Sequence, residues 1–157
     1  MNSIILVVVI IILVAFYLIK SAKNKKIAQG HIAAGHAFLM TNKTQADITE
    51  TTSGLQYQVL KKGTGSRHPS ASSTVQVHYH GTLLDGTVFD SSVERKQPIS
   101  FPLNQVIKGW TEGVQLMNEG DQFKFFIPSH LAYGNSAAGK IPPGSVLIFE
   151  VKLLAIQ

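Results

Sequence analysis

The sequence predicts an α+β protein, with a mainly β body over residues 54–157 behind an apolar N-terminal segment. Apolar and polar residues alternate in several stretches after Gly54, and only one stretch of the body has helical apolar spacing. An uninterrupted apolar run occupies Ile4 to Ile19. The length of 157 residues argues for one domain with accessory segments. We therefore expect a transmembrane anchor over residues 1–19, a basic juxtamembrane segment and linker helix over 20–53, and the main domain over 54–157.

The N-terminal run has the length and composition of a single membrane-spanning helix. Its sixteen residues would span about 24 Å at about 1.5 Å per residue, against a hydrocarbon core of about 30 Å. The preceding residues 1–3 and a snorkelling Lys20 close that gap. A cleaved signal peptide is one alternative, but no Lys or Arg precedes the run and no small-x-small cleavage site follows it cleanly. A buried soluble helix is a weaker alternative, because the run has no polar face.

The lysines around the run predict how the anchor is oriented. Four of them follow the run directly, namely Lys20, Lys23, Lys25 and Lys26, and no Lys or Arg precedes it. The positive-inside rule then places the body in the cytoplasm. An anchor with such a short N-terminal tail can also insert the other way round, which would place the body in the periplasm.

Residues 20–53 read as a helical linker. Ile27 to Leu39 predicts a modest helix with small residues on one side, and Asn42 to Ser53 reads as a linker or a fraying helix end. His31 and His36 are five residues apart, so they do not share a helical face and are expected to be solvated.

The body begins with a series of short strands. Leu55 to Leu60 alternates, and Thr74 to Leu83 alternates strictly. Asp85-Gly86 is a strong hairpin signal, after which Val88 to Ser91 would pair back. Ile99 to Phe101 is a further short strand.

One helix and two strands complete the body. Trp110 to Met117 has apolar residues at helical spacing, and Glu119-Gly120-Asp121 ends the helix. Gln122 to Ile127 alternates, and Val146 to Ile156 predicts a long closing strand.

Several classes of site are excluded by the residues present. The chain has no cysteine, so it has no disulfide or thiolate metal site. His78 and His80 share a strand face, but no third ligand accompanies them, and a solvated face is the better reading. No Gly-x-Ser-x-Gly elbow occurs, and Gly63-Thr64-Gly65 reads as a turn and not as a phosphate loop. The charge of residues 54–157 is nearly balanced, so nucleic acid is not an expected partner. We expect no metal and no cofactor.

The aromatic residues of the body are the remaining candidates for a site. They lie at strand ends, at the helix start and in loops, where they either fill the core or line a pocket. Phe123 and Phe125 are expected to be core residues. Trp110 follows Gly109 at a helix start, where a pocket floor is plausible, and the Gly- and Ala-rich loop from Tyr133 to Gly144 can fold over a ligand as a flap.

A set of motifs carries a family resemblance. The motifs are Val77-His78-Tyr79, Gly86-Thr87-Val88-Phe89-Asp90-Ser91-Ser92, Val106-Ile107-Lys108-Gly109-Trp110, Leu131-Ala132-Tyr133-Gly134 and Ile141-Pro142-Pro143. Together, in this order and over about Ser53 to Gln157, they resemble the FKBP-type peptidyl-prolyl cis-trans isomerases. Each motif alone is weak, but the set is highly specific. The stretch Phe101 to Ile107 and the lead-in at Ala37-Phe38-Leu39 are similar to the bacterial branch that includes the macrophage infectivity potentiators.

The resemblance implies a fold and a site. The fold is FKBP-like, with an antiparallel β-sheet wrapped around the one short helix at Trp110. The implied catalytic residues are Tyr79, Phe89, Asp90, Trp110, Tyr133 and Phe149, and the implied substrate-binding residues are Phe101, Val106, Ile107 and Ile141. Ile99 stands where the family usually has an aromatic residue, and Lys140 replaces a more familiar apolar flap residue. Both differences should affect substrate preference or macrolide contacts more than the reaction.

The resemblance also implies a function. The chain would be a peptidyl-prolyl cis-trans isomerase that acts on proline-containing polypeptides, assists folding and binds macrolide inhibitors of the FK506 type. As a bacterial protein with one membrane span, it would lie in the inner membrane. We assign Trp110 to the floor under the proline ring, Asp90 to the edge of the site, and the Ile107 backbone N–H and the Tyr133 hydroxyl to substrate carbonyls. A membrane-tethered, non-catalytic chaperone module that binds proline peptides is the alternative.

Overall fold

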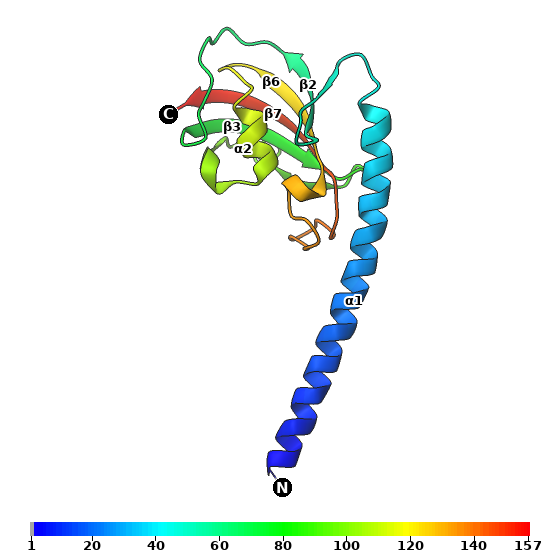
Figure 1. Ribbon diagram of the computed structural model, residues 1–157. Helices are drawn as coiled ribbons and strands as arrows, with labels where there is room; N and C mark the ends of the chain where they lie inside the picture. The colour runs from blue at the N-terminus through cyan, green and yellow to red at the C-terminus, as the bar shows by residue number, and fades with distance from the viewer. Residues whose placement is uncertain (1) are drawn as a thin grey trace.

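The computed structural model describes residues 2–157, with side chains from residue 5 onward. A long helix, α1 (Asn2–Asn42), leads into a body that contains a seven-stranded antiparallel sheet and the short helix α2 (Lys108–Val114), as Figure 1 shows. The strands are β1 (Ile48–Glu50), β2 (Gln56–Lys61), β3 (Thr74–Thr82), β4 (Val88–Ser91), β5 (Ile99–Pro102), β6 (Gln122–Ile127) and β7 (Leu147–Ile156). Two single-turn 3-10 helices, η1 (Leu103–Gln105) and η2 (Ser129–Leu131), complete the described elements.

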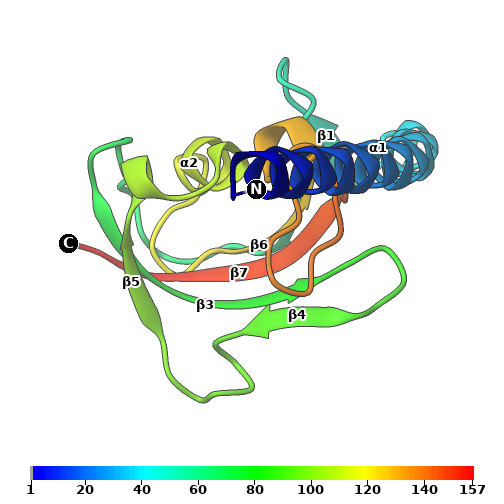
Figure 2. The ribbon, with the colours of Figure 1, turned by 90° about the horizontal axis from the view of Figure 1, so that it is seen from below.

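The sheet curves around α2, which confirms the expected α+β class. Its strand order is β1-β2-β6-β7-β3-β4, and β5 pairs with β3 beyond that path. Seen from below, β3, β6 and β7 form a curved layer with α2 on its concave side (Figure 2). The site described below lies on the same side.

Strand β3 shows the predicted alternation. Its buried and partly buried residues alternate along all nine positions, with Val75, Val77 and Tyr79 buried toward α2 and the core. This strand pairs with β7, β4 and β5. Tyr79 therefore reaches the core from the middle of the sheet, between the strands that supply the other aromatic residues.

The turn after β3 is the predicted hairpin turn. Gly86 has φ +86°, a conformation that glycine adopts without the steric cost of a Cβ atom. The Asp85 carboxylate accepts a hydrogen bond from the Thr87 N–H at 2.9 Å. This geometry returns the chain along β4, which places Phe89 and Asp90 beside β3.

Helix α2 differs from the prediction in its bounds. It runs from Lys108 to Val114 rather than from Trp110 to Met117. The apolar spacing is real, since Trp110, Val114 and Met117 are all buried, but Met117 lies in the turn after the helix. The last N–H groups bond three residues back, as in Met117 N–H to Val114 O at 3.1 Å, so the chain tightens and leaves the helix.

Two glycines allow α2 to lie close against β6. A β-carbon on Gly109 would lie 2.5 Å from the nearest atom of Ile127, and one on Gly113 would lie 2.7 Å from Phe125. The two glycines are four residues apart and so share one face of the helix. This close approach places Trp110 over the concave side of the sheet.

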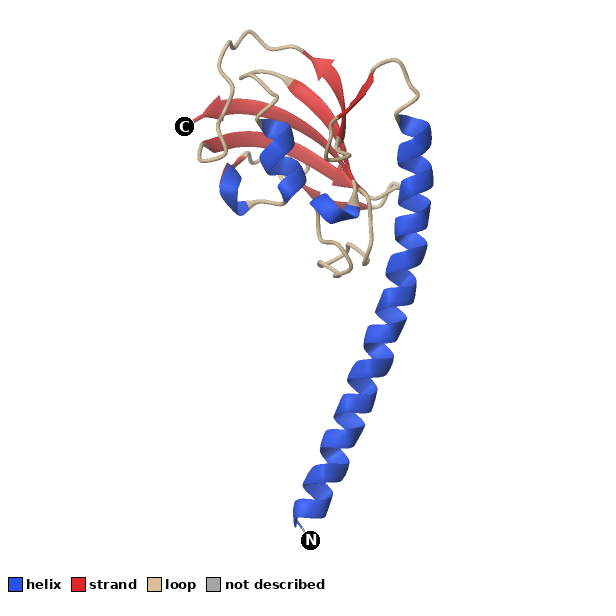
Figure 3. Ribbon diagram, in the orientation of Figure 1, coloured by secondary structure: helices blue, strands red, loops and turns tan. Residues whose placement is uncertain are grey.

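The expected anchor helix and linker helix form one continuous helix, because α1 runs from Asn2 to Asn42 (Figure 3). The residues between the apolar run and Ile27 include no proline or glycine, so nothing interrupts the backbone hydrogen bonds there. Part of α1 is a candidate membrane span by length and composition, with a mean hydropathy of 2.8, and its apolar side chains from Ile5 to Ile19 are exposed.

The segment from Asn42 to Ser53 is also more ordered than a linker. It contains β1, whose Ile48 pairs with Gln58 of β2. Three residues are too few to show an alternation pattern. This edge strand is therefore defined by its pairing with β2 and could not be predicted from its own sequence.

Candidate active site

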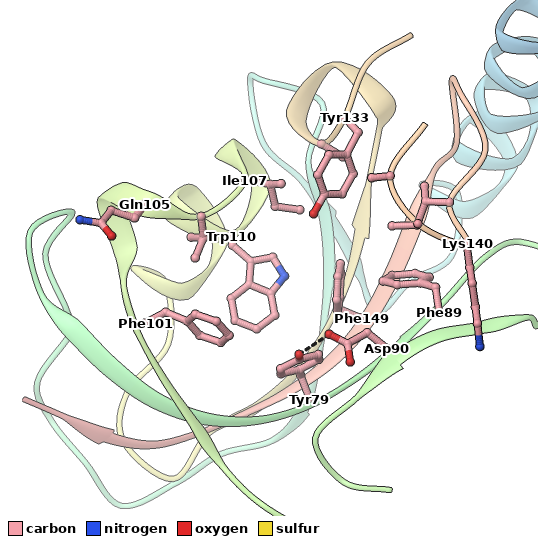
Figure 4. Close-up of a pocket in the computed structure, with 15 residues that line it drawn as sticks. Tyr79, Phe89, Asp90, Phe101, Gln105, Ile107, Trp110, Tyr133, Lys140 and Phe149 are labelled. Atoms are coloured by element: carbon pink, nitrogen blue, oxygen red, sulfur yellow. Dashed lines mark hydrogen bonds between the residues drawn. The ribbon is translucent and has the colours of Figure 1, made fainter. Parts of the chain in front are cut away.

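A cavity of about 760 Å³ opens on the concave side of the sheet. We call it the aromatic cavity, and Figure 4 shows the residues that line it. All ten residues that the resemblance implied line this cavity. They come from β3, β4, β5, α2 and its approach, the loop after η2, and β7. Five further residues also line it, namely Gln105, Ala132, Ala138, Gly139 and Lys140.

Trp110 forms the floor, and three rings surround it edge-on. Its ring centroid lies 5.4 Å from that of Tyr79, 5.7 Å from Phe101 and 5.3 Å from Phe149, with interplanar angles of 80° to 88°. Edge-to-face contacts of this kind are favourable beyond the area that they bury. Phe89 extends the set, with its centroid 5.3 Å from that of Phe149. These contacts fix the floor as a rigid apolar surface.

The indole N–H of Trp110 is a polar group in this apolar floor. Trp110 Nε1 is buried and has no hydrogen-bond partner among the described residues. Buried donors without partners are rare in folded proteins.

Asp90 lies at the cavity edge in a network with two partners. It accepts hydrogen bonds from the Tyr79 hydroxyl and from Arg95. Arg95 also donates to the Tyr79 hydroxyl oxygen at 3.2 Å. Asp90 therefore holds the Tyr79 hydroxyl at the cavity edge. Arg95 was missed, because it lies five residues further on in a turn and no sequence pattern links it to Asp90.

The network sets the protonation states at the cavity edge. Partial burial raises the pKa of Asp90, but the hydrogen bonds from Tyr79 and Arg95 and the charge of Arg95 outweigh burial and lower that pKa below its ordinary value of 3.8. Burial, and then the hydrogen bond to Asp90, raise the pKa of the Tyr79 hydroxyl above 10.0. At neutral pH the carboxylate is charged and the phenol is neutral, so neither is set up for proton transfer.

We expect turnover at this site to be independent of pH from about pH 5 to about pH 9. The lowered pKa of Asp90 means that its contribution to stability is present above pH 3.8 and is lost as the pH falls through the folded-state pKa. The raised pKa of Tyr79 means that its contribution is present below pH 10.0 and is lost as the pH rises through its folded-state pKa. An NMR assay of turnover that uses no coupling protease measures this profile. A bell-shaped dependence inside the interval would contradict a site without proton transfer.

The loop over the cavity is the predicted flap, which we define as residues 133–144. Tyr133 is 44% exposed, and its hydroxyl points toward the cavity in Figure 4. Ala138 and Ile141 exchange backbone hydrogen bonds of 3.0 and 2.9 Å. Ile141 is buried, whereas Lys140 is exposed and its ammonium group points away from the floor. The flap therefore supplies one hydroxyl, the apolar side chains of Ala138 and Ile141, and one cation to the rim.

One expectation about side chains near the cavity needs correction. His78 and His80 are not freely solvated: each is half-buried, with Nδ1 at 3.0 Å from Ser92 Oγ and 2.9 Å from Ser91 Oγ respectively. Both serines lie at the end of β4, the strand that pairs with β3, or directly after it. Ile99 packs against the core and does not line the aromatic cavity.

The sequence matches two family profiles. One, described as FKBP-type peptidyl-prolyl cis-trans isomerase, covers residues 65–154, and the other, described as the domain amino-terminal to that isomerase, covers residues 12–59. The isomerase named FkpA from Aeromonas hydrophila is 57% identical over 136 residues, which are 87% of this chain and 50% of that protein. The outer membrane protein MIP of Legionella longbeachae is 45% identical over 88% of this chain and 59% of that protein. The chain thus spans about half the length of these curated relatives.

Solved structures agree with the sequence matches. The crystal structure of FkpA from Escherichia coli superposes with a TM-score of 0.85 at 40% identity, over 95% of this chain and 71% of that one. A peptidyl-prolyl cis-trans isomerase from Pseudomonas syringae gives a TM-score of 0.76 at 37% identity, over 82% of this chain and 95% of that one.

Proposed function

Because the chain belongs to the FKBP-type peptidyl-prolyl cis-trans isomerase family, we propose that it accelerates cis-trans rotation of X-Pro bonds in polypeptides. The observation that carries this proposal is the aromatic cavity, in which three rings surround the Trp110 floor edge-on. A proline ring is a compact apolar group, and a floor of this kind suits it.

The chemistry needs only a change of environment. A planar peptide bond is stabilised by resonance, and the barrier to rotation is about 18–20 kcal/mol. In the twisted transition state this resonance is lost and the carbonyl is less polar. A dry apolar site favours the twisted form over the polar planar amide. Each 1.4 kcal/mol of this preference gives about a tenfold rate increase.

We propose the following roles for the lining residues. Trp110 supports the proline ring, with Phe89, Phe149, Val106 and Ile107 as walls. The Tyr133 hydroxyl and the Ile107 backbone N–H bind substrate carbonyls, and the direction of the Tyr133 hydroxyl in Figure 4 supports this. The remaining lining residues of this proposal are Tyr79, Phe101 and Ile141. Asp90 organises the edge of the site through Tyr79.

A chymotrypsin-coupled assay with a proline tetrapeptide tests the proposal. Acceleration that an FK506-type macrolide abolishes would support an isomerase whose inhibitor binds in the aromatic cavity. Peptide binding without acceleration would instead indicate the alternative, a membrane-tethered chaperone module that binds proline-containing segments without catalysis.

We expect Lys140 to give the site a charge preference. Its ammonium group adds a cation at the rim, where a residue flanking the proline would pass. A tetrapeptide with Glu before proline should be turned over about two- to fivefold better than one with Lys, the range expected of an exposed ion pair. Lys140→Leu should remove this difference, and Lys152→Leu, an exposed lysine outside the cavity, should retain it. Equal ratios in Lys140→Leu and the unmodified protein would contradict the assignment.

We propose that the apolar part of α1 anchors the body to the bacterial inner membrane as a single span. The exposed apolar side chains of residues 5–19 support this. The lysines after the run favour a cytoplasmic body, with a periplasmic body as the alternative. Alkaline phosphatase fused to the C-terminus is active only outside the cytoplasm, so its activity distinguishes the two sides.

A further inference from the structure

The last turns of α1 pack tightly on the body. Ala28 is 1% exposed, whereas most of α1 is exposed. Gly35 lies seven residues later on the same face, and a β-carbon there would lie 2.5 Å from Val146 Cγ2. Seven residues later again, Asn42 Nδ2 donates a hydrogen bond to Gln56 Oε1 at 2.8 Å. Three residues on one face of the helix, spaced seven residues apart, therefore contact the body.

The contacts of Ala28 and Gly35 lie at the base of the flap. A β-carbon on Gly144 would lie 2.3 Å from the carbonyl oxygen of Ala28, so the two backbones touch. Gly144 has φ +76° and donates its N–H to Gly134 O at 2.8 Å, which closes the flap at its base. Val146 follows directly. Figures 1 and 2 show the flap beside α1 at this point.

The flap in turn carries five of the residues that line the aromatic cavity. Tyr133 begins it, and Ile141 lies three residues before Gly144. Beyond the base, the flap is held by the bonds between Ala138 and Ile141 and by Ser145 Oγ donating to Pro142 O at 2.7 Å. These short-range bonds keep its shape but do not fix its position over the cavity.

We propose that α1 positions the flap over the aromatic cavity, with Ala28 and Gly35 as positioning residues. The proposal rests on the proposed isomerase function for its effect on turnover. Protein interiors are close-packed, so a contact with no room for one methyl group transmits a displacement to its neighbour. A shift of α1 relative to the body would then move Ile141 and Tyr133 and change how tightly substrate is bound. Neither Ala28 nor Gly35 lines the cavity.

The test compares the addition of one methyl group at two glycines of α1, Gly35 and Gly30. Gly35→Ala places a methyl against Val146, whereas Gly30→Ala makes the same change in the same helix with nothing within 4 Å. The double variant Gly35→Ala/Val146→Ala removes the obstructing Cγ2 and leaves the Val146 β-carbon position 3.6 Å away, an ordinary contact. The single variant Val146→Ala completes the double-mutant cycle. All variants are made in the full chain in detergent micelles.

The readouts are amide hydrogen exchange of the flap and the separate values of KM and kcat. In Gly35→Ala we expect flap exchange and KM to rise by about three- to tenfold, as overpacking of a tight contact would give, with kcat near its original value. Gly30→Ala should match the unmodified protein, and the double variant should return both readouts toward it.

Three results would overturn the proposal: flap exchange equal in Gly35→Ala and Gly30→Ala, faster exchange spread equally over β3 and β7, or faster flap exchange with an unchanged KM. The second result would indicate a general loss of stability. If even the unmodified protein does not accelerate isomerisation, the proposed function fails, and the exchange data still decide whether α1 positions the flap.

Discussion

Phe149→Ala is expected to lower kcat/KM for a proline tetrapeptide by about tenfold to a hundredfold, equivalent to about 1.4–2.8 kcal/mol of lost transition-state preference. Phe149 is 6% exposed and contacts Trp110, Phe89 and Tyr79 through its ring. Its loss opens one wall of the aromatic cavity and admits water to the rotating amide. Chymotrypsin-coupled kinetics of the purified protein measure the effect.

Phe123→Ala is the matched control. Phe123 is 1% exposed and lies on the adjacent strand β6, but it stacks on Tyr57 of β2, with ring centroids 5.5 Å apart, and does not line the cavity. Both variants should lose at most about 3–5 kcal/mol of folding free energy, the usual range for replacing a buried phenylalanine by alanine. Only Phe149→Ala should lose the larger part of its turnover while folded. Equal losses in the two variants would attribute the effect to stability and contradict the role of Phe149.

Asp90→Val is the second variant with a large expected effect, and we expect about a tenfold loss of kcat/KM, equivalent to about 1.4 kcal/mol. It removes the acceptor of both the Tyr79 hydroxyl and Arg95. Tyr79 is 5% exposed and packs edge-on against Trp110, so its displacement would disturb the floor. The same coupled assay applies, with near-ultraviolet circular dichroism to report on the aromatic packing.

Two further variants separate charge from shape at this position. Asp90→Asn keeps the size of the side chain but removes its charge, and Arg95→Gln removes the cation while leaving Asp90 to accept from Tyr79. We expect Arg95→Gln to cost less than either change at Asp90, because Arg95 is exposed and exposed ion pairs contribute little. Full turnover in both Asp90 variants would exclude Asp90 from the site.

Much of the fold could be predicted because it depends on patterns among residues that are close together in the sequence. The alternation in β3 and the Asp85-Gly86 turn are direct consequences of side-chain period and of backbone geometry at glycine. The cavity residues were predicted from motifs that resemble a family and not from periodicity. Periodicity can distinguish a buried aromatic residue from an exposed one, but it cannot tell whether a buried residue fills the core or lines a pocket.

The features that the sequence could not predict depend on contacts between distant residues. Arg95 pairs with Asp90 only because a turn folds back on β4, and β1 exists only through its pairing with β2. The continuity of α1 was missed because the change from apolar to basic composition near Lys20 resembles a boundary, although composition does not interrupt a helix. Gly35 and Gly144 appear in the sequence as ordinary glycines, and their role follows from how closely two backbones approach.

The unbroken course of α1 has a further consequence for which polypeptides the protein can reach. Lys20 and Ala28 are separated by eight residues, or about 12 Å of helix at about 1.5 Å per residue. With the apolar part of α1 in a bilayer, this stiff helix would fix the height and the orientation of the body above the lipid surface. A client would then be selected by geometry as well as by sequence, since its prolines must pass at that height.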